Sequence, residues 1–436
     1  MENKSVNKEP SIIVGGFVLG GAMIGAGMFS LPTIMSGAWF INSLFILFIV
    51  CFFMFHSGIY ILECISKYGT GTNYFHISKE LLPKWACYLA NASLIFVLYI
   101  LIYAYISAAG SIIHEASLLY GINLNLRVIF FVFTIVLGAT IWWGGACASR
   151  LTSIFLFIKI VLFVLAFSGL FFKARGDLLF SATFEGKSQL YLYPFIFIII
   201  PYAITSFGYH GNVCSLYKLY HENERKVVKS CVIGCVLALV IYLLWMIGTM
   251  GNLPREQFIT IIQKGGNLDA FIDSLYTVLN SKYIEGFLLW FSISAVFCSF
   301  LGVAIGLFDY ILASLKFEDN KTGRLKSGIL CFTPPLLLCL LFPNGFLIAI
   351  AYAGTAACIW AIICPAVMAL KAREKFPNSG FKVWGGERIN LCCYRFWCCR
   401  YYLPNISTVW ILTYLSLIYQ DNQGKENQSR AIGYTL

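Results

Sequence analysis

The sequence predicts an all-α integral membrane protein, and three observations support that fold class. Of the 436 residues, 59% are hydrophobic and 12% are charged, whereas soluble domains carry about 25% charged residues. Eleven stretches are apolar enough to cross a bilayer as helices, which takes about 20 residues each. Two of these stretches, the first and the sixth, are interrupted by glycines.

The predicted spans are joined by loops that are too short to hold a soluble domain. In chain order they cover residues 12–40, 41–65, 85–113, 128–143, 151–172, 192–216, 227–250, 283–315, 327–342, 345–370 and 401–419. The eighth span is long enough to tilt. The eleventh is the weakest, because Arg400, Pro404 and Asn405 reduce its apolar character.

The placement of basic residues predicts the orientation. With the N-terminal tail 1–11 inside, about two thirds of the 31 Lys and Arg residues fall on the inner side, which matches the excess of positive charge in cytoplasmic loops. The tail lacks the apolar core and cleavage site of a signal peptide. We therefore expect a cytoplasmic N-terminus, a cytoplasmic basic segment 371–400 and an external polar tail 420–436.

The first glycine-broken segment, residues 20–32, reads GGAMIGAGMFSLP. Broken backbone at membrane depth is tolerated where it lines a cavity or is buried in protein. An unwound stretch here would direct freed N–H groups and the start of the next half-helix toward a substrate carboxylate. The substrate-binding candidates from this break are Gly25, Ala26, Gly27 and Met28. The simpler interpretation is close helix packing through the Gly16-xxx-Gly20 spacing, and both can hold on different faces.

The second broken segment, residues 204–216, reads ITSFGYHGNVCSL and is more polar than the first. Freed carbonyls here would receive a substrate ammonium, and Phe207 would supply an aromatic wall. Ser206, Phe207 and Gly208 are the substrate-binding candidates. His210 is a candidate for proton coupling, because histidine changes charge near neutral pH, although a hydrogen-bonded structural histidine is the more frequent case.

Lys159 lies in the middle of the fifth span, within SIFLFIKIVLFVLAF. An ionisable residue inside the membrane indicates function by default, and a buried lysine can load and release a proton. Lys159 is therefore the second candidate for proton coupling. On the third span Tyr99 and Tyr103 share one helical face. That face suits an aromatic, partly polar substrate, although tyrosine stripes more often serve packing.

Several other classes of protein are disfavoured. The net charge of +11 lies in short loops between spans, which argues against nucleic acid binding. No phosphate-binding loop, nucleophile elbow or zinc-protease motif appears, so we expect no enzyme and no cofactor. The 16 cysteines suggest neither a disulfide framework nor a metal site, because no histidine follows the run that ends at Cys399. The expected partners are a small ligand and the lipid bilayer, with no obligate protein partner.

Nine segments between about Gly15 and Gly386 carry a resemblance to a known family. They read GGAMIGAGMFSLPTIMSGAWF, MFHSGIYILE, YILIYAYISAAGSI, TSFGYHGNVCSL, MGNLPREQFI, KGGN, FLGVAIGLFDY, LFPNGFLIAIAYAG and FKVWGG. With these motifs the chain resembles the hydroxy/aromatic amino acid permeases, and most closely their bacterial tryptophan-specific branch. The run SFGYHGN at 206–212 is a hallmark of that family, and Lys159 matches a lysine in the fifth helix of the tryptophan carriers. After Gly386 the resemblance ends.

The resemblance implies a leucine-transporter-like fold with two inverted five-helix repeats, 12–172 and 192–370. Each repeat begins with a broken helix, and the eleventh helix follows the second repeat. It implies a symporter that uses the proton gradient to import an aromatic amino acid, tryptophan first and tyrosine next, across the bacterial cytoplasmic membrane. In related proton-coupled carriers such a lysine takes the place of a sodium ion. Two alternatives stay open: a sodium-coupled amino acid carrier, and a membrane sensor that binds the same ligand without moving it.

Overall fold

The computed structural model describes residues 11–383, apart from 70–71, 120, 181–182, 185–186, 189–193, 265, 267, 280–281 and 379. The predicted eleventh helix 401–419 and the polar tail 420–436 lie outside the described residues, as do residues 1–10 and 384–400. Within the described ranges the chain is helical apart from one short hairpin, which confirms the predicted class of an all-α membrane protein.

Eight helices among the described residues are long and apolar enough to cross a membrane. Their bounds are Trp39–Ile65 (α3), Lys84–Leu119 (α5), Leu126–Trp143 (α6), Gly145–Lys173 (α7), Glu224–Met250 (α11), Lys282–Ser314 (α14), Lys321–Leu341 (α15) and the continuous run of Phe346–Ala357 (α16), Cys358–Ile363 (η4) and Cys364–Lys375 (α17). The helix η4 is a single π-turn that ends two residues before Pro365. Because proline has no N–H to donate, the helix widens there instead of continuing its regular bonding.

Both predicted breaks are present. In the first, Ile12–Met23 (α1) is followed by the 3₁₀-helix Ala26–Phe29 (η1) and Ser30–Met35 (α2), and the two halves are bent by 52°. In the second, α9 and α10 are separated by irregular backbone and the 3₁₀-helix η3. Their bounds are Pro194–Ser206 (α9), His210–Asn212 (η3) and Val213–Leu219 (α10). With 13 residues α9 is too short to cross alone, so a single sixth span made of both halves stays a prediction.

The remaining elements are short and lie between the spans. They are Tyr74–Leu81 (α4), Gly176–Leu179 (α8), Thr183–Phe184 (β1), Lys187–Ser188 (β2), Arg255–Gln263 (α12) and Leu268–Leu279 (α13). The two strands pair antiparallel.

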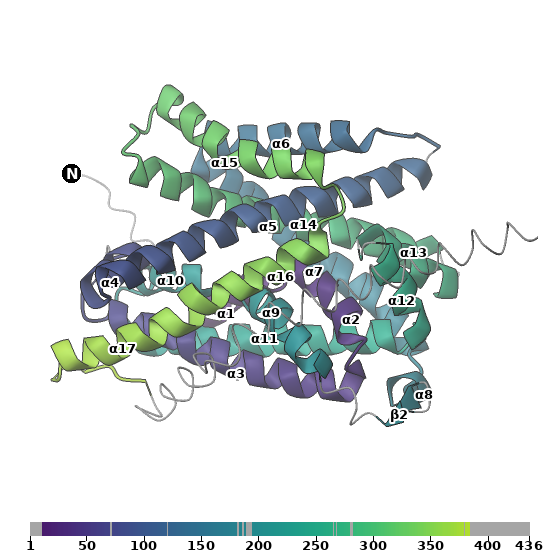
Figure 1. Ribbon diagram of the computed structural model, residues 1–436, viewed down its shortest axis with the longest axis horizontal. Helices are drawn as coiled ribbons and strands as arrows, with labels where there is room; N and C mark the ends of the chain where they lie inside the picture. Colours follow the sequence, from purple (N-terminus) through teal and green to yellow (C-terminus); the bar gives the residue numbers. More distant parts are fainter. Residues whose placement is uncertain are drawn as a thin grey trace, which may run out of the picture.

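The broken segments lie inside the bundle (Figure 1). Helices α3 and α11 run along one side, α6 and α15 along the other, and α5 and α14 cross between them. The most extensive contacts join α1 to α11, α9 to α16, α7 to α14, and α5 to both α14 and α16. The two breaks are therefore enclosed by helices from both halves of the chain.

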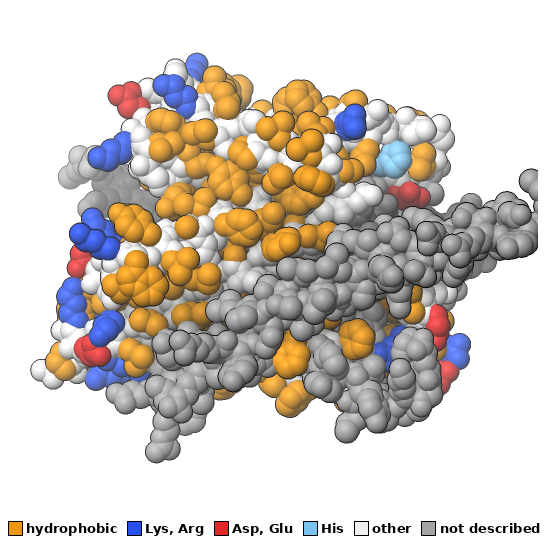
Figure 2. All heavy atoms as spheres, in the orientation of Figure 1, with side chains coloured by type: hydrophobic (Ala, Val, Ile, Leu, Met, Phe, Trp, Pro, Cys, Tyr) orange, Lys and Arg blue, Asp and Glu red, His pale blue; other side chains and the backbone are white. Residues whose placement is uncertain are grey.

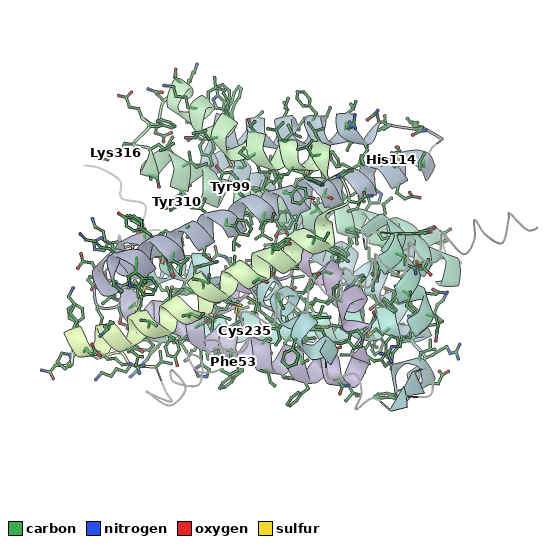
Figure 3. All side chains as sticks on the ribbon, in the orientation of Figure 1. Phe53, Tyr99, His114, Cys235, Tyr310 and Lys316 are labelled. Carbon is green, nitrogen blue, oxygen red and sulfur yellow. The ribbon has the colours of Figure 1, made fainter. Side chains whose placement is uncertain are left out.

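The surface has the pattern of a membrane protein. Hydrophobic side chains cover the broad middle of the visible face, and Lys and Arg gather along its left edge near α4 and α17 (Figure 2). Large apolar side chains such as Phe48, Val132 and Phe157 are more than half exposed, which fits contact with lipid. Lys316 and His114 lie toward opposite ends of the molecule (Figure 3), so the spans cross from one charged end to the other.

A buried ion pair joins the ends of α3 and α17. Arg373 donates to both carboxylate oxygens of Glu63, at 2.6 and 2.8 Å, and the backbone N–H of Val383 donates to the same carboxylate at 2.9 Å. The Glu63 side chain is completely buried. Nearby, the Lys67 ammonium donates to the carbonyl of Phe381 at 2.7 Å. Together these contacts fasten the segment after α17 to the end of α3.

We expect Glu63→Ala to lower the free energy of unfolding in detergent by about 3 kcal/mol, because it leaves a largely buried guanidinium without its partner. The double variant Glu63→Leu/Arg373→Met should recover most of that loss. The control is Glu374→Ala, which removes an exposed pair with Lys371 and should change stability by less than about 1 kcal/mol. Thermal unfolding followed by gel filtration measures all three, and equal melting of the Glu63 and Glu374 variants would contradict the expectation.

Candidate functional site

The first break exposes backbone groups to α14. Helix α1 ends at Met23, and Gly25 adopts an extended conformation. The N–H of Ala26 donates to the Ser299 hydroxyl at 3.1 Å. A Cβ on residue 25 would lie 2.6 Å from that oxygen, so glycine is required there if Ser299 is to cap the break.

The second break is partly open. Helix α9 ends at Ser206, and Gly208 and Tyr209 form no regular structure before η3. Phe207 and Tyr209 are buried, whereas Gly208 between them is accessible to solvent. A polar group of a ligand can therefore reach the backbone at Gly208.

The two breaks meet. A Cβ on Gly27 would lie 3.3 Å from the Ser206 hydroxyl oxygen and 3.6 Å from the Ser206 Cα. The Tyr242 hydroxyl of α11 donates toward the carbonyls of Met23, at 2.7 Å, and of Ser206, at 2.6 Å. The substrate-binding candidates from the two broken segments thus include neighbours in space, with Ala26 and Met28 buried beside them.

Lys159 lies on the first break. Its ammonium donates to the carbonyls of Gly21, at 3.1 Å, and of Ile24, at 2.5 Å, and the Cys298 sulfur of α14 is 4.0 Å away. The side chain is 1% exposed. Lys159 therefore connects α7 to the end of α1. On α14 its contact is the Cys298 sulfur.

His210 faces α3. Its Nε2 lies 2.7 Å from the Ser57 hydroxyl, which donates to the carbonyl of Met54 at 3.0 Å. The one hydrogen of that hydroxyl can point to the Met54 carbonyl, with Nε2–H donating to Ser57, or to Nε2, with the ring hydrogen on Nδ1. Nδ1 is buried and has no hydrogen-bond partner. His210 is 2% exposed, so a proton reaches the ring only after the packing around it opens.

The aromatic candidates divide into two places. Phe207 packs against Tyr242 near the breaks, with ring centroids 5.1 Å apart. The Tyr99 hydroxyl donates to the Leu330 carbonyl at 3.0 Å, and the Tyr103 hydroxyl donates to the Phe342 carbonyl at 2.8 Å. Both tyrosines thus turn toward α15 and the residue directly after it. Figure 3 labels Tyr99 on the upper side of α5.

A sequence profile of the tryptophan/tyrosine permease family matches residues 8–402. The chain belongs to this family. The matched range includes both breaks and Lys159, and it extends beyond Gly386, where the resemblance in the motifs ends. A permease is a transport protein, so the prediction of a transporter and not an enzyme is confirmed.

The relatives are bacterial permeases. The permease is 94% identical to the low affinity tryptophan permease of Proteus vulgaris over 389 residues, which cover 89% of the chain and 93% of the relative. It is 45% identical to the low affinity tryptophan permease of Escherichia coli K12, over 88% of the chain and 92% of the relative. It is 36% identical to the tyrosine permease of Enterobacter agglomerans, over 85% of the chain and 90% of the relative. The permease is therefore a multi-pass protein of a bacterial membrane.

The packing interpretation of the first glycines also applies to this permease. A Cβ on Gly16 would lie 2.4 Å from Ile233, and one on Gly20 would lie 2.8 Å from Leu237, both on α11. One on Gly21 would lie 2.7 Å from Leu156 of α7. The glycines before the break serve close packing, whereas Gly25 and Gly27 serve the break itself.

Sequence reasoning did not identify Tyr242, Ser299 or Ser57 as site residues. Tyr242 is one of several tyrosines in apolar spans, and the two serines are ordinary small residues in their helices. Only their contacts with the breaks distinguish them. In the described part of the permease, no three His, Cys, Asp or Glu side chains are grouped in a way that would hold a metal ion.

Proposed function

We propose that this permease is a proton-coupled symporter that imports an aromatic amino acid across the bacterial cytoplasmic membrane by alternating access. The observation that carries the proposal is the buried Lys159 ammonium on the carbonyls of Gly21 and Ile24. A helix C-terminus bears a partial negative charge of roughly half an electron, and broken helices in transporters use such carbonyls to hold the coupling cation. A lysine in that position can exchange a proton in place of an ion.

Tryptophan is the proposed first substrate and tyrosine the second. The permease named for tryptophan in Proteus vulgaris is 94% identical, and the one named for tyrosine in Enterobacter agglomerans is 36% identical. The substrate carboxylate would lie at the first break, beside Gly25 to Met28. The N–H groups of Gly25, Ala26 and Met28 already donate to the Met23 carbonyl, the Ser299 hydroxyl and the Gly25 carbonyl, so the carboxylate would use the N–H of Gly27 or displace one of these bonds. Because Tyr242 takes the Ser206 carbonyl, the ammonium would use the carbonyls next to Gly208.

We propose two inverted repeats, residues 12–172 and 192–370, which correspond to a leucine-transporter-like fold. The packing supports this arrangement, because exchanging the repeats reproduces it. The contact of α1 with α11 corresponds to that of α9 with α3, and the contact of α7 with α14 corresponds to that of α16 with α5. The excess of basic residues supports a cytoplasmic N-terminus, and labelling of single cysteines from outside intact cells tests it.

The experiment that tests the function is uptake of radiolabelled tryptophan into proteoliposomes. With the interior alkaline, we expect accumulation in sodium-free buffer, abolition by a protonophore, and competition by unlabelled tryptophan more than by tyrosine. Accumulation that requires a sodium gradient would overturn proton coupling. Tryptophan binding without accumulation under any gradient would instead identify a sensor.

We also propose that Phe207 and at least one of Tyr99 and Tyr103 line the aromatic pocket, since apolar walls with a few polar groups are usual for ligand sites. Alanine at all three positions should raise the tryptophan KM by about tenfold or more. Each contact between aromatic rings contributes about 0.5–1.5 kcal/mol in addition to the free energy from burying apolar surface area. Exposed Phe172 offers a control, Phe172→Ala, which should leave KM unchanged. An unchanged KM in the triple variant would show that the aromatic pocket lies elsewhere.

A further inference from the structure

A single hydroxyl lies between the two broken segments. Tyr242 Oη is 2.7 Å from the carbonyl oxygen of Met23 and 2.6 Å from that of Ser206. Met23 is the last residue of α1 and Ser206 the last residue of α9. Two helix C-terminal ends, one from each half of the chain, therefore converge on one side chain.

Two helix C-terminal ends that lie this close together need a positive group or a hydrogen-bond donor between them. Each helix end carries partial negative charge on its last carbonyls, and a buried carbonyl without a donor loses free energy relative to its hydrated state. A phenol has one hydrogen, so it donates to one of these carbonyls fully or to both weakly. Tyr242 is completely buried. Its one hydrogen serves the Ser206 carbonyl and the second lone pair of the Met23 carbonyl, which also accepts from the Gly25 N–H at 2.7 Å.

The position of that hydroxyl is fixed by packing. A Cβ on Gly234 of α11 would lie 2.8 Å from the Leu19 Cβ and 3.1 Å from the Gly20 nitrogen, so α1 and α11 touch along their backbones. On its other side the Tyr242 ring packs against Phe207, directly after Ser206. The hydroxyl is thus held at the junction by both segments that it bonds.

Such a junction is suited to a monovalent cation. In transporters with broken helices, unwound carbonyls and half-helix C-terminal ends coordinate sodium or a proton. We propose that the Tyr242 hydroxyl occupies a cation position at the junction of the two broken segments, as a tethered neutral donor that holds their ends in register without an ion. This inference rests on the proposed transport function and adds a positioning residue to it.

Two substitutions separate the roles of the ring and of the hydroxyl. Tyr242→Phe keeps the ring and removes the donor, so we expect Vmax for tryptophan to fall about tenfold with KM unchanged, in sodium and choline buffers alike. Tyr242→Ser removes the ring and leaves room beside the two carbonyls. We expect this variant to lose uptake in choline chloride and to regain it about fivefold or more in sodium chloride.

The matched control is Tyr74→Ser. Tyr74 is also buried and donates to one backbone carbonyl, that of Trp360 at 2.7 Å, but it does not join two helix ends. Its serine variant should show no sodium stimulation. Gel filtration in detergent identifies variants that fail to fold, and Tyr242→Phe, which conserves shape, remains informative if Tyr242→Ser does not fold.

A binding measurement distinguishes this inference from the transport proposal. A cation that binds only the folded protein raises its melting temperature, so sodium chloride should raise the melting temperature of Tyr242→Ser and leave that of the unsubstituted permease unchanged relative to choline chloride. Vmax of Tyr242→Phe within twofold of the unsubstituted permease, or equal melting of Tyr242→Ser in both salts, would overturn the inference. Absence of uptake by the unsubstituted permease would instead overturn the transport proposal.

Discussion

Lys159→Gln will abolish accumulation of tryptophan against a gradient while tryptophan binding remains measurable. The ammonium of Lys159 contacts the Gly21 and Ile24 carbonyls from α7. When protonated it bridges these elements as a bound cation would, and when neutral it lets them shift relative to each other. A ligand shifts such an equilibrium only by its differential affinity for the two states, so glutamine, which cannot change charge, removes the coupling.

The expected accumulation ratio of tryptophan follows from the free energy of the proton gradient. Moving one elementary charge through 100 mV releases about 2.3 kcal/mol, which supports an accumulation ratio of about 50 for one proton per substrate. The ratio in Lys159→Gln should fall to about one. Exposed Lys321 at the start of α15 provides the control, and Lys321→Gln should keep the full ratio.

Binding of tryptophan, measured by scintillation proximity, establishes that the variant has folded. If Lys159→Gln still concentrates tryptophan in response to an imposed pH gradient, His210 becomes the proton carrier to test. Its Nε2 contacts the Ser57 hydroxyl and its buried Nδ1 has no hydrogen-bond partner, so the added proton would go to whichever of these two nitrogens carries the lone pair. His210→Gln would then lose accumulation, and Ser57→Ala would weaken it.

Gly27→Val will abolish uptake and leave membrane insertion intact. Already the first carbon of a side chain at position 27 would lie 3.3 Å from the Ser206 hydroxyl, and valine adds two methyl groups that push the two breaks apart. Overpacking of this kind costs about 1–3 kcal/mol, enough to lose the register of a binding site but not a whole membrane fold. Gly208→Val should act similarly, because its Cβ would lie 3.1 Å from the Thr205 carbonyl oxygen.

Gly211→Ala is the matched control for both valine variants. It belongs to the second broken segment, as Gly208 does, yet a Cβ there meets nothing within 4 Å. We expect uptake within about twofold of the unsubstituted permease. Initial uptake rates, normalised to protein in the membrane fraction, measure all three variants. Equal loss in Gly211→Ala would mean that the segment tolerates no side chain for reasons other than contact between the breaks.

The breaks and the burial of Lys159 are predictable from the sequence because each breaks a local rule. Glycine is costly inside a helix, and a lysine is costly inside a membrane. The glycines and the lysine can therefore be recognised in the sequence even when the residues that they contact are unknown. The same reasoning places Tyr99 and Tyr103 on one helical face, and their hydroxyls do reach the carbonyls of Leu330 on α15 and of Phe342 directly after it.

Contacts between distant helices are not predictable in this way. Tyr242 and Met23 are 219 residues apart, and Ser299 and Ala26 are 273 residues apart. Tyrosine and serine are tolerated in many membrane helices, so neither residue violates a local rule. Which carbonyl each one reaches depends on how α11 and α14 pack against the breaks. The pattern of residues along one helix does not indicate that packing.

The buried pair of Glu63 and Arg373 also constrains the order of biosynthesis. The two residues are 310 positions apart in the chain, and ribosomes add about 5–20 residues per second. The carboxylate of Glu63 therefore waits about 15–60 s for its guanidinium. During that interval the carboxylate is either solvated by water or neutralised by a proton, because a charge in hydrocarbon costs several kcal/mol. The end of α3 consequently reaches its final environment only after α17 has left the ribosome, so one of the first helices to be made is among the last to be completed.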